Sequence, residues 1–115
     1  MHELSLIANL FEILNEKACE QHAKKIIFVK LKVGRLSGAV PEFLETAFEV
    51  YKNGTIAQEA RLELEEVPLK VRCQKCATET IQDDFVFICP HCGARDLKTL
   101  EGTELLLERL ELELE

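Results

Sequence analysis

Apolar residues near the start of the chain recur at steps of three and four, the spacing of an amphipathic helix over residues 4–22. The apolar residues that would share one side of this helix are Ile7, Leu10, Phe11, Leu14 and Ala18. A second helical pattern begins at Pro41, a residue that suits a first helical position, and ends at Asn53-Gly54, which favours a left-handed stop. The sequence therefore predicts two helices, over 4–22 and 41–53.

Between and after these helices, apolar and polar residues alternate, which is the period of a half-buried strand. The first such run extends from Ile26 to Gly34, and the residues expected to point inward are Ile27, Val29, Leu31 and Val33. A second run begins near Ala60, but its apolar phase shifts near Glu66, so we expect a bulge or bend before Pro68. Residues 104–115 alternate leucine with glutamate towards their end. Although both are good helix formers, a helix would scatter the leucines around its circumference, so we predict a strand.

The order of these elements predicts an α+β fold, with a small sheet of about three strands and two helices. Four cysteines lie between the second and the last predicted strand, in a segment with too little apolar material to fold unaided. We therefore expect a discontinuous α+β domain formed by residues 1–69 and 101–115. Residues 70–100 would form an inserted, zinc-ribbon-like domain.

Composition and charge narrow the class of protein. The chain has 115 residues, enough for one modest core, and its 47% hydrophobic and 30% charged content excludes a disordered tail. Neither a membrane-spanning apolar run nor the pattern of a signal peptide is found, so we expect a cytoplasmic protein with no membrane partner. The 21 acidic residues outnumber 14 basic ones, for a net charge of −7, which argues against binding to nucleic acid.

The cysteine spacing indicates a metal site. Cys73 and Cys76 form one pair, and Cys89 and Cys92 form another after twelve intervening residues. Two residues between thiolates let one tight turn present both sulfurs to an ion, and Gly93 suits the positive-φ position after the second pair. Four thiolates leave no open position, so the pattern predicts a closed, structural site, with Zn²⁺ as the first candidate.

Three other interpretations of the cysteines stay open. An electron-transfer iron site uses the same four sulfurs, but the flanking residues here are polar and supply no aromatic shell. A thioredoxin-like redox pair would follow a strand and open a helix, which neither pair does. A zinc-ribbon module that binds nucleic acid or protein is the main rival, although residues 70–98 hold only five basic against four acidic residues.

Other candidate residues carry less information. His91 lies between two ligands and is expected to be a solvent-facing spacer, and Cys19, late in the first helix, a small buried hydrophobe. The sequence shows no His/Asp/Ser cluster and no glycine-rich phosphate loop, so we expect no enzyme.

The N-terminus offers a second set of metal ligands. If Met1 is retained, its α-amine, the next amide nitrogen and the His2 imidazole could form chelate rings around an ion that prefers nitrogen, such as Ni²⁺ or Cu²⁺. Any chain that begins Met-His has these groups, and a frayed terminus is the alternative. Here the first helix begins at once, which would hold His2 against the folded domain.

Several motifs together resemble a known family. These are Met1-His2-Glu3, residues 32–37 (Lys-Val-Gly-Arg-Leu-Ser) after the first strand, the Ala47-Phe48-Glu49 stretch of the second helix, and the two CxxC pairs before a last strand. In this combination and order, over essentially the whole chain, the sequence resembles the HypA/HybF nickel metallochaperones of hydrogenase maturation.

The resemblance implies specific ligands and partners. His2 would be the essential nickel ligand and Glu3 its neighbour in the site, with the Met1 amine and backbone nitrogens completing a transient Ni²⁺ site. Cys73, Cys76, Cys89 and Cys92 would hold structural Zn²⁺. Some relatives have an aspartate before the second helix where this chain has Val40, with Glu42 the nearest carboxylate.

The implied partners are the GTPase HypB and the large subunit of [NiFe]-hydrogenase, and in some bacteria the urease maturation system. The protein would be a monomer or a dimer.

Overall fold

The computed structural model describes residues 2–82 and 87–115, except for the side chain of His2. Within these residues, two helices and six strands follow one another in the order α1 (His2–Glu20), β1 (Ala23–Gly34), α2 (Pro41–Tyr51), β2 (Arg61–Val67), β3 (Leu69–Cys73), β4 (Glu79–Gln82), β5 (Leu97–Glu101) and β6 (Leu105–Leu114). The strands form two three-stranded sheets, one ordered β2-β1-β6 and the other β4-β3-β5. The predicted α+β class and the separate cysteine-containing unit are confirmed.

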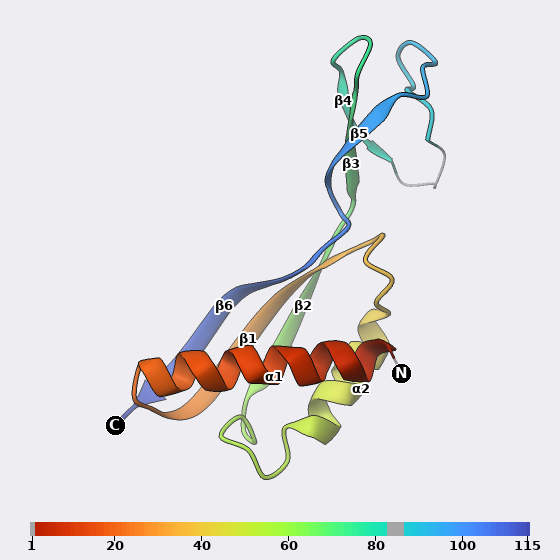
Figure 1. Ribbon diagram of the computed structural model, residues 1–115. Coiled ribbons are helices and arrows are strands. Elements are labelled where there is room, and N and C mark those ends of the chain that lie inside the picture. The colour runs from red at the N-terminus through yellow and green to blue at the C-terminus, as the bar shows by residue number, and fades with distance from the viewer. Residues whose placement is uncertain (1, 83–86) are drawn as a thin grey trace.

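The first sheet and both helices enclose the main core (Figure 1). β1 pairs in parallel with β2, and α2 supplies the crossover that parallel strands require. On its other side β1 pairs antiparallel with β6, so the chain's last strand returns to the first sheet. All five residues of the predicted α1 stripe are buried: Ile7, Leu10, Phe11, Leu14 and Ala18.

The predicted inward face of β1 is wrong at its first position. Ile26 is fully buried, whereas Ile27 is 45% exposed. The register against β6 shifts between Ile26 and Phe28, and such an irregularity moves the alternation by one residue. From Val29 to Val33 the predicted phase is correct.

The irregularity predicted before Pro68 is a passage between sheets rather than a bulge in one strand. β2 ends at Val67 in the first sheet, and β3 begins at Leu69 in the second. Pro68 cannot donate to a ladder, which suits this break. Leu69 and Val71 then point into the second unit, where both are buried.

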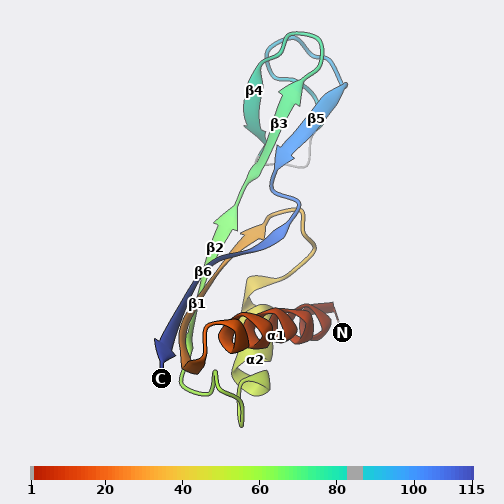
Figure 2. The same cartoon turned by 60° about the vertical axis from the view of Figure 1, so that its left-hand side comes forward.

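The molecule is elongated, with extents of 56 × 27 × 17 Å, and the second sheet projects from the end of the first (Figures 1 and 2). Among the described residues, no helix has the length and apolar content needed to cross a membrane. The division into domains of 1–69 with 101–115 and of 70–100 stays a prediction.

At the junction between the sheets, three segments approach closely. The Leu36 N–H donates to the Gly102 carbonyl (2.7 Å), and the Arg35 N–H donates to the Val67 carbonyl (2.9 Å). A Cβ at Gly102 would lie 2.7 Å from both the Leu69 Cα and the Pro68 oxygen. The junction therefore also fixes the start of the loop that leads to α2.

Candidate metal sites

Two similar turns bring the four cysteines together at the end of the second sheet. In the first turn the Ala77 N–H donates to the Cys73 carbonyl (2.9 Å), and in the second the Gly93 N–H donates to the Cys89 carbonyl (2.8 Å). The residue after each pair has a positive φ, 63° at Ala77 and 77° at Gly93. Gly93 confirms the predicted left-handed position, whereas nothing in the sequence marks Ala77.

The sulfur geometry fits a tetrahedral ion. The Sγ atoms of Cys73 and Cys92 are 3.5 Å apart, those of Cys76 and Cys89 are 3.7 Å apart, and all four lie within 4.8 Å of one another. Zinc–sulfur bonds of about 2.3 Å give tetrahedral edges of about 3.8 Å. The four cysteines therefore form a group that could hold one zinc ion, as predicted.

Hydrogen bonds prepare these sulfurs as ligands. The pKa of Cys73 is lowered because the Cys76 N–H reaches its sulfur at 3.5 Å. The pKa of Cys76 falls to about 6, first because of its side-chain hydrogen bond with Thr78, whose Oγ1 lies 3.2 Å from the sulfur. Sequence reasoning missed Thr78, although its place two residues after a ligand is a usable signal.

Without an ion, the sulfurs compete for protons. The Ala94 N–H lowers the pKa of Cys92, but contacts with the sulfurs of Cys73, Cys76 and Cys89 outweigh it and raise that pKa to about 12. Closely packed thiolates repel one another, so one site retains a proton when the others ionise. A divalent ion would reduce this conflict by neutralising part of the thiolate charge.

Two minor predictions have different outcomes. His91 is exposed, as expected of a spacer that faces solvent. The prediction that Cys19 is buried is wrong, because Cys19 is exposed. Ala18 occupies the inward position on α1, and the next residue lies about 100° further around the helix.

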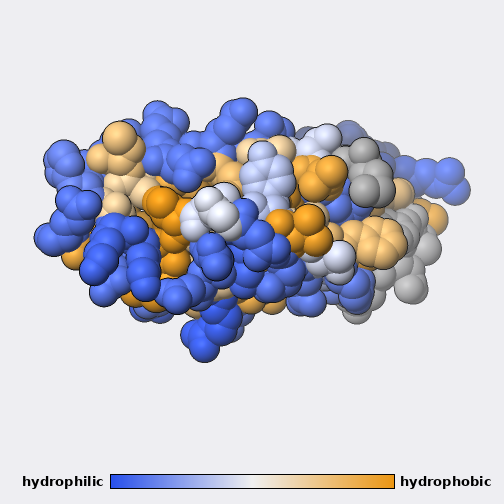
Figure 3. All heavy atoms as spheres, turned by 90° about the horizontal axis from the view of Figure 1, so that it is seen from below, coloured by the Kyte–Doolittle hydropathy of each residue, from blue (hydrophilic) through white to orange (hydrophobic). Residues whose placement is uncertain are grey.

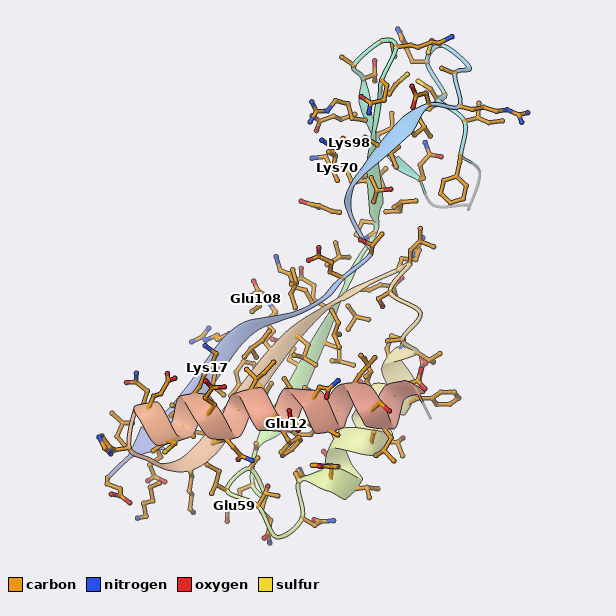
Figure 4. The ribbon with its side chains drawn as sticks, viewed as in Figure 1. Glu12, Lys17, Glu59, Lys70, Lys98 and Glu108 are labelled. Atoms are coloured by element: carbon orange, nitrogen blue, oxygen red, sulfur yellow. The ribbon has the colours of Figure 1, made fainter. Side chains whose placement is uncertain are left out.

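Basic residues lie on β3 and β5, next to the strand ends that lead into the cysteine turns. Figure 4 shows Lys70 on β3 and Lys98 on β5 on the same side of the second sheet, with sulfur atoms at its far end. Lys70 is paired with Glu79 (3.4 Å), and Arg72 lies 3.9 Å from the same carboxylate. Lys70 and Arg72 therefore share one carboxylate, which offsets part of their charge and weakens the case for a phosphate-binding ribbon.

The N-terminal candidate site lies at the start of α1. The helix begins at His2, and the Glu3 carboxylate accepts a hydrogen bond from the Val40 N–H (3.2 Å). Val40 is the N-cap residue of α2, so this bond ties the first turn of α1 to the start of the second helix. Glu42 is two residues further on and is exposed. Met1 lies outside the described residues.

The two candidate sites lie in different parts of the molecule. The first residues of α1 are beside the start of α2, whereas the cysteine turns are at the far end of the second sheet in both ribbon views (Figures 1 and 2). An ion held by the sulfurs and an ion held at the N-terminus would therefore share no ligand.

Comparison with known proteins assigns the chain to a family. A family model described as "Hydrogenase/urease nickel incorporation, metallochaperone, hypA" matches residues 1–112. The hydrogenase maturation factor HypA of Desulfitobacterium hafniense is 40% identical over 113 residues, which cover 98% of this chain and 99% of that protein. HypA of Aquifex aeolicus is 36% identical over 115 residues and the full length of both.

Solved structures agree with the fold. The solution structure of the Ni metallochaperone HypA from Helicobacter pylori superposes with a TM-score of 0.73, at 23% identity and 98% coverage of both chains. A second solution structure of a HypA protein gives a TM-score of 0.76, at 24% identity, with 100% of this chain and 98% of that chain covered. From the family match and the full-length relatives, the chain belongs to the HypA family of nickel-incorporation metallochaperones in hydrogenase maturation.

Proposed function

We propose that this protein binds Ni²⁺ at its N-terminus and delivers it to the large subunit of [NiFe]-hydrogenase. The His2 imidazole and Glu3 would be side-chain ligands, and the Met1 amine and first backbone amides would supply nitrogens. The observation that carries the proposal is the hydrogen bond from the Val40 N–H to Glu3, because it supports a fixed position for the start of α1. The family's role in nickel incorporation supports the choice of ion.

The zinc site would have a separate, structural task. Cys73, Cys76, Cys89 and Cys92 would hold Zn²⁺, which supplies a cross-link between the two turns. The buried Cys73 and Cys89 side chains belong to the packing of this unit, so loss of the ion would disturb the second sheet. Sulfur ligands with no open position retain their ion, whereas nickel intended for transfer needs a site that a new ligand can enter.

Delivery would proceed by ligand exchange at the start of α1. A few nitrogen ligands at a terminus leave coordination positions for an acceptor protein, so Ni²⁺ can pass without being released. We propose that this occurs in the cytoplasm together with the GTPase HypB, and that urease maturation is a further client in organisms with that enzyme.

The direct test removes one imidazole. His2→Ala is expected to abolish stoichiometric nickel binding in a calorimetric titration of untagged protein, with the zinc content and the helix signal unchanged. The matched control is His22→Asn, which removes an imidazole at a position with φ of 55° that asparagine tolerates. Full nickel binding by His2→Ala would refute the proposed ligand.

A second test concerns the amine. An N-terminal extension converts the α-amine of Met1 into an amide, so it is expected to weaken nickel binding even with His2 present. A C-terminal extension of equal length is the control. Equal nickel affinity in both tagged proteins would show that the amine is no ligand.

A further inference from the structure

The two cysteine turns share the same backbone hydrogen bonds. The Cys73 N–H donates to the Thr78 carbonyl (3.0 Å), and the Cys89 N–H donates to the Ala94 carbonyl (2.8 Å). In both turns the residue before this acceptor has a positive φ. Thr78 and Ala94 therefore occupy equivalent places, each two residues after the second cysteine of its pair.

The side chains at these equivalent places differ. The Thr78 Oγ1 lies 3.2 Å from the Cys76 sulfur, whereas Ala94 has only a methyl group to offer Cys92. A thiolate has no proton to donate, so the hydroxyl must be the donor once Cys76 ionises to bind an ion. The first turn therefore has a hydrogen bond to its second sulfur that the side chain of Ala94 cannot make.

Solvent exposure of the four ligands differs in the same direction. Cys73 and Cys89, the first cysteines of the two pairs, are buried. Cys76 is half-buried, and Cys92 is exposed. A reagent in water therefore reaches Cys92 more readily than any of the other three cysteines.

We propose that Cys92 is the reactive ligand of the zinc site, the sulfur that a carbon electrophile attacks first, and that Thr78 protects Cys76 from the same reaction. The negative charge of a thiolate makes it a nucleophile, and a hydrogen bond that draws on this charge lowers its reactivity. Thr78 is thus a positioning residue that acts through Cys76. This inference rests on the zinc site of the proposed function.

The reaction is an alkylation, for which iodoacetamide is the probe. The Cys92 thiolate attacks the methylene carbon, a sulfur–carbon bond forms, and iodide leaves with the electrons of the carbon–iodine bond. The product is an uncharged thioether, so three thiolates remain in the site. Only the first event on each chain reports on the intact site, because the loss of one ligand loosens the others.

The test uses full-length, zinc-loaded protein in a small excess of Zn²⁺, and peptide mass spectrometry measures early alkylation at each cysteine. Cys19 is the internal standard, because it is exposed on α1, which lies at the opposite end of the molecule from the cysteine turns (Figure 1). Figure 3 shows that end from below, where hydrophilic side chains border the apolar ones, so the reagent approaches from water. Cys92 is expected to react at least about fivefold faster than Cys76.

A pair of variants separates the effect of the hydroxyl from that of exposure. Thr78→Val keeps the shape of the side chain and removes the hydroxyl, so it is expected to raise the alkylation rate of Cys76 about fivefold relative to Cys19. Thr99→Val, which removes an exposed hydroxyl from β5, is the matched control and is expected to leave that rate unchanged.

The reciprocal variant is Ala94→Thr, which gives the second turn the side chain of the first. It is expected to slow the alkylation of Cys92 about fivefold. Ala94→Ser adds the same donor in a smaller side chain and replaces this variant if threonine disturbs the turn. Zinc content and circular dichroism verify that each variant retains the site and the fold.

Two results would overturn the inference while the zinc site stands. The first is alkylation of Cys76 at least as fast as that of Cys92 in the wild-type protein. The second is an unchanged rate at Cys76 in zinc-loaded Thr78→Val. Absence of zinc from the untreated protein would instead refute the zinc site of the proposed function, and this inference with it.

Discussion

Replacement of Gly102 by alanine is the most informative perturbation of the junction between the two sheets. Gly102 has a φ of 101°, and an added Cβ would lie 2.7 Å from the Leu69 Cα and 2.7 Å from the Pro68 oxygen. Both are backbone atoms, so no side chain can rotate away to make room. The substitution would therefore impose an unfavourable backbone conformation and a steric clash at once.

The size of the effect follows from its two parts. A positive φ at alanine costs about 1–2 kcal/mol, and overpacking of a tight contact costs about 1–3 kcal/mol. Gly54 has a φ of 77° with nothing within 4 Å of its added Cβ, so Gly54→Ala has the first cost alone. We expect Gly102→Ala to lower the free energy of unfolding by about 3 kcal/mol and Gly54→Ala by about 1 kcal/mol.

The assay is urea unfolding of zinc-loaded protein at one fixed zinc concentration, followed by far-ultraviolet circular dichroism. Gly34→Ala is a third arm, because its Cβ would lie 2.5 Å from the Gly102 carbonyl carbon without a positive φ at residue 34. If Gly102→Ala loses no more stability than Gly54→Ala, the close approach of the segments at the junction is refuted.

The remaining predictions concern the cysteine turns and the N-terminal contact. Ala77→Gly is expected to stabilise the zinc-loaded protein by about 0.5–1 kcal/mol in the same unfolding assay. Glycine removes the strain of a φ of 63°, and the greater conformational entropy of the unfolded glycine variant offsets part of this gain. A loss of stability would contradict the left-handed turn. Zinc binding to the metal-free protein is expected to release at least one proton at pH 7, because the pKa of Cys92 is raised to about 12 while that of Cys76 is lowered to about 6. Lower pH therefore weakens zinc binding, and calorimetry in buffers of different ionisation enthalpy measures the release; no buffer dependence would contradict it. Glu3→Ala is expected to cost about 0.5–1 kcal/mol of stability because it removes the acceptor for the Val40 N–H, and an unchanged midpoint of unfolding would show that this bond contributes nothing.

The sequence predicted the parts of the fold that depend on local period. The α1 stripe from Ile7 to Ala18 is buried as expected, and the strand at the C-terminus exists despite its helix-forming leucines and glutamates. Strict alternation outweighed intrinsic propensity there, because only a strand can place Leu110 and Leu112 against the core.

The parts that were missed depend on contacts between distant segments. The shift that exposes Ile27 arises from the register of β1 against β6, which is far away in sequence. The chain crosses from the first sheet to the second at Pro68. In the sequence this crossing produces a shift in the apolar–polar alternation, and a bulge within one strand would produce the same shift. β4 and β5 have short, polar sequences, so their pairing with β3 has no strong local signal.

The candidate sites were predicted to different depths. Cysteine spacing identified all four sulfurs, because two tight turns impose a fixed distance between ligands. The contribution of Thr78 to the pKa of Cys76 and the link between Glu3 and Val40 needed coordinates. The nickel ligands at His2 and Glu3 stay a prediction, because a chelating terminus is defined by chemistry that the fold does not display.

The measurement that tests the account most directly is metal analysis of untagged protein, purified once without and once with added Ni²⁺. The account predicts one zinc per chain in both samples and one nickel per chain in the second only. Absence of nickel in the second sample, or nickel gained only as zinc is lost, would contradict the assignment of separate sites to the two metals.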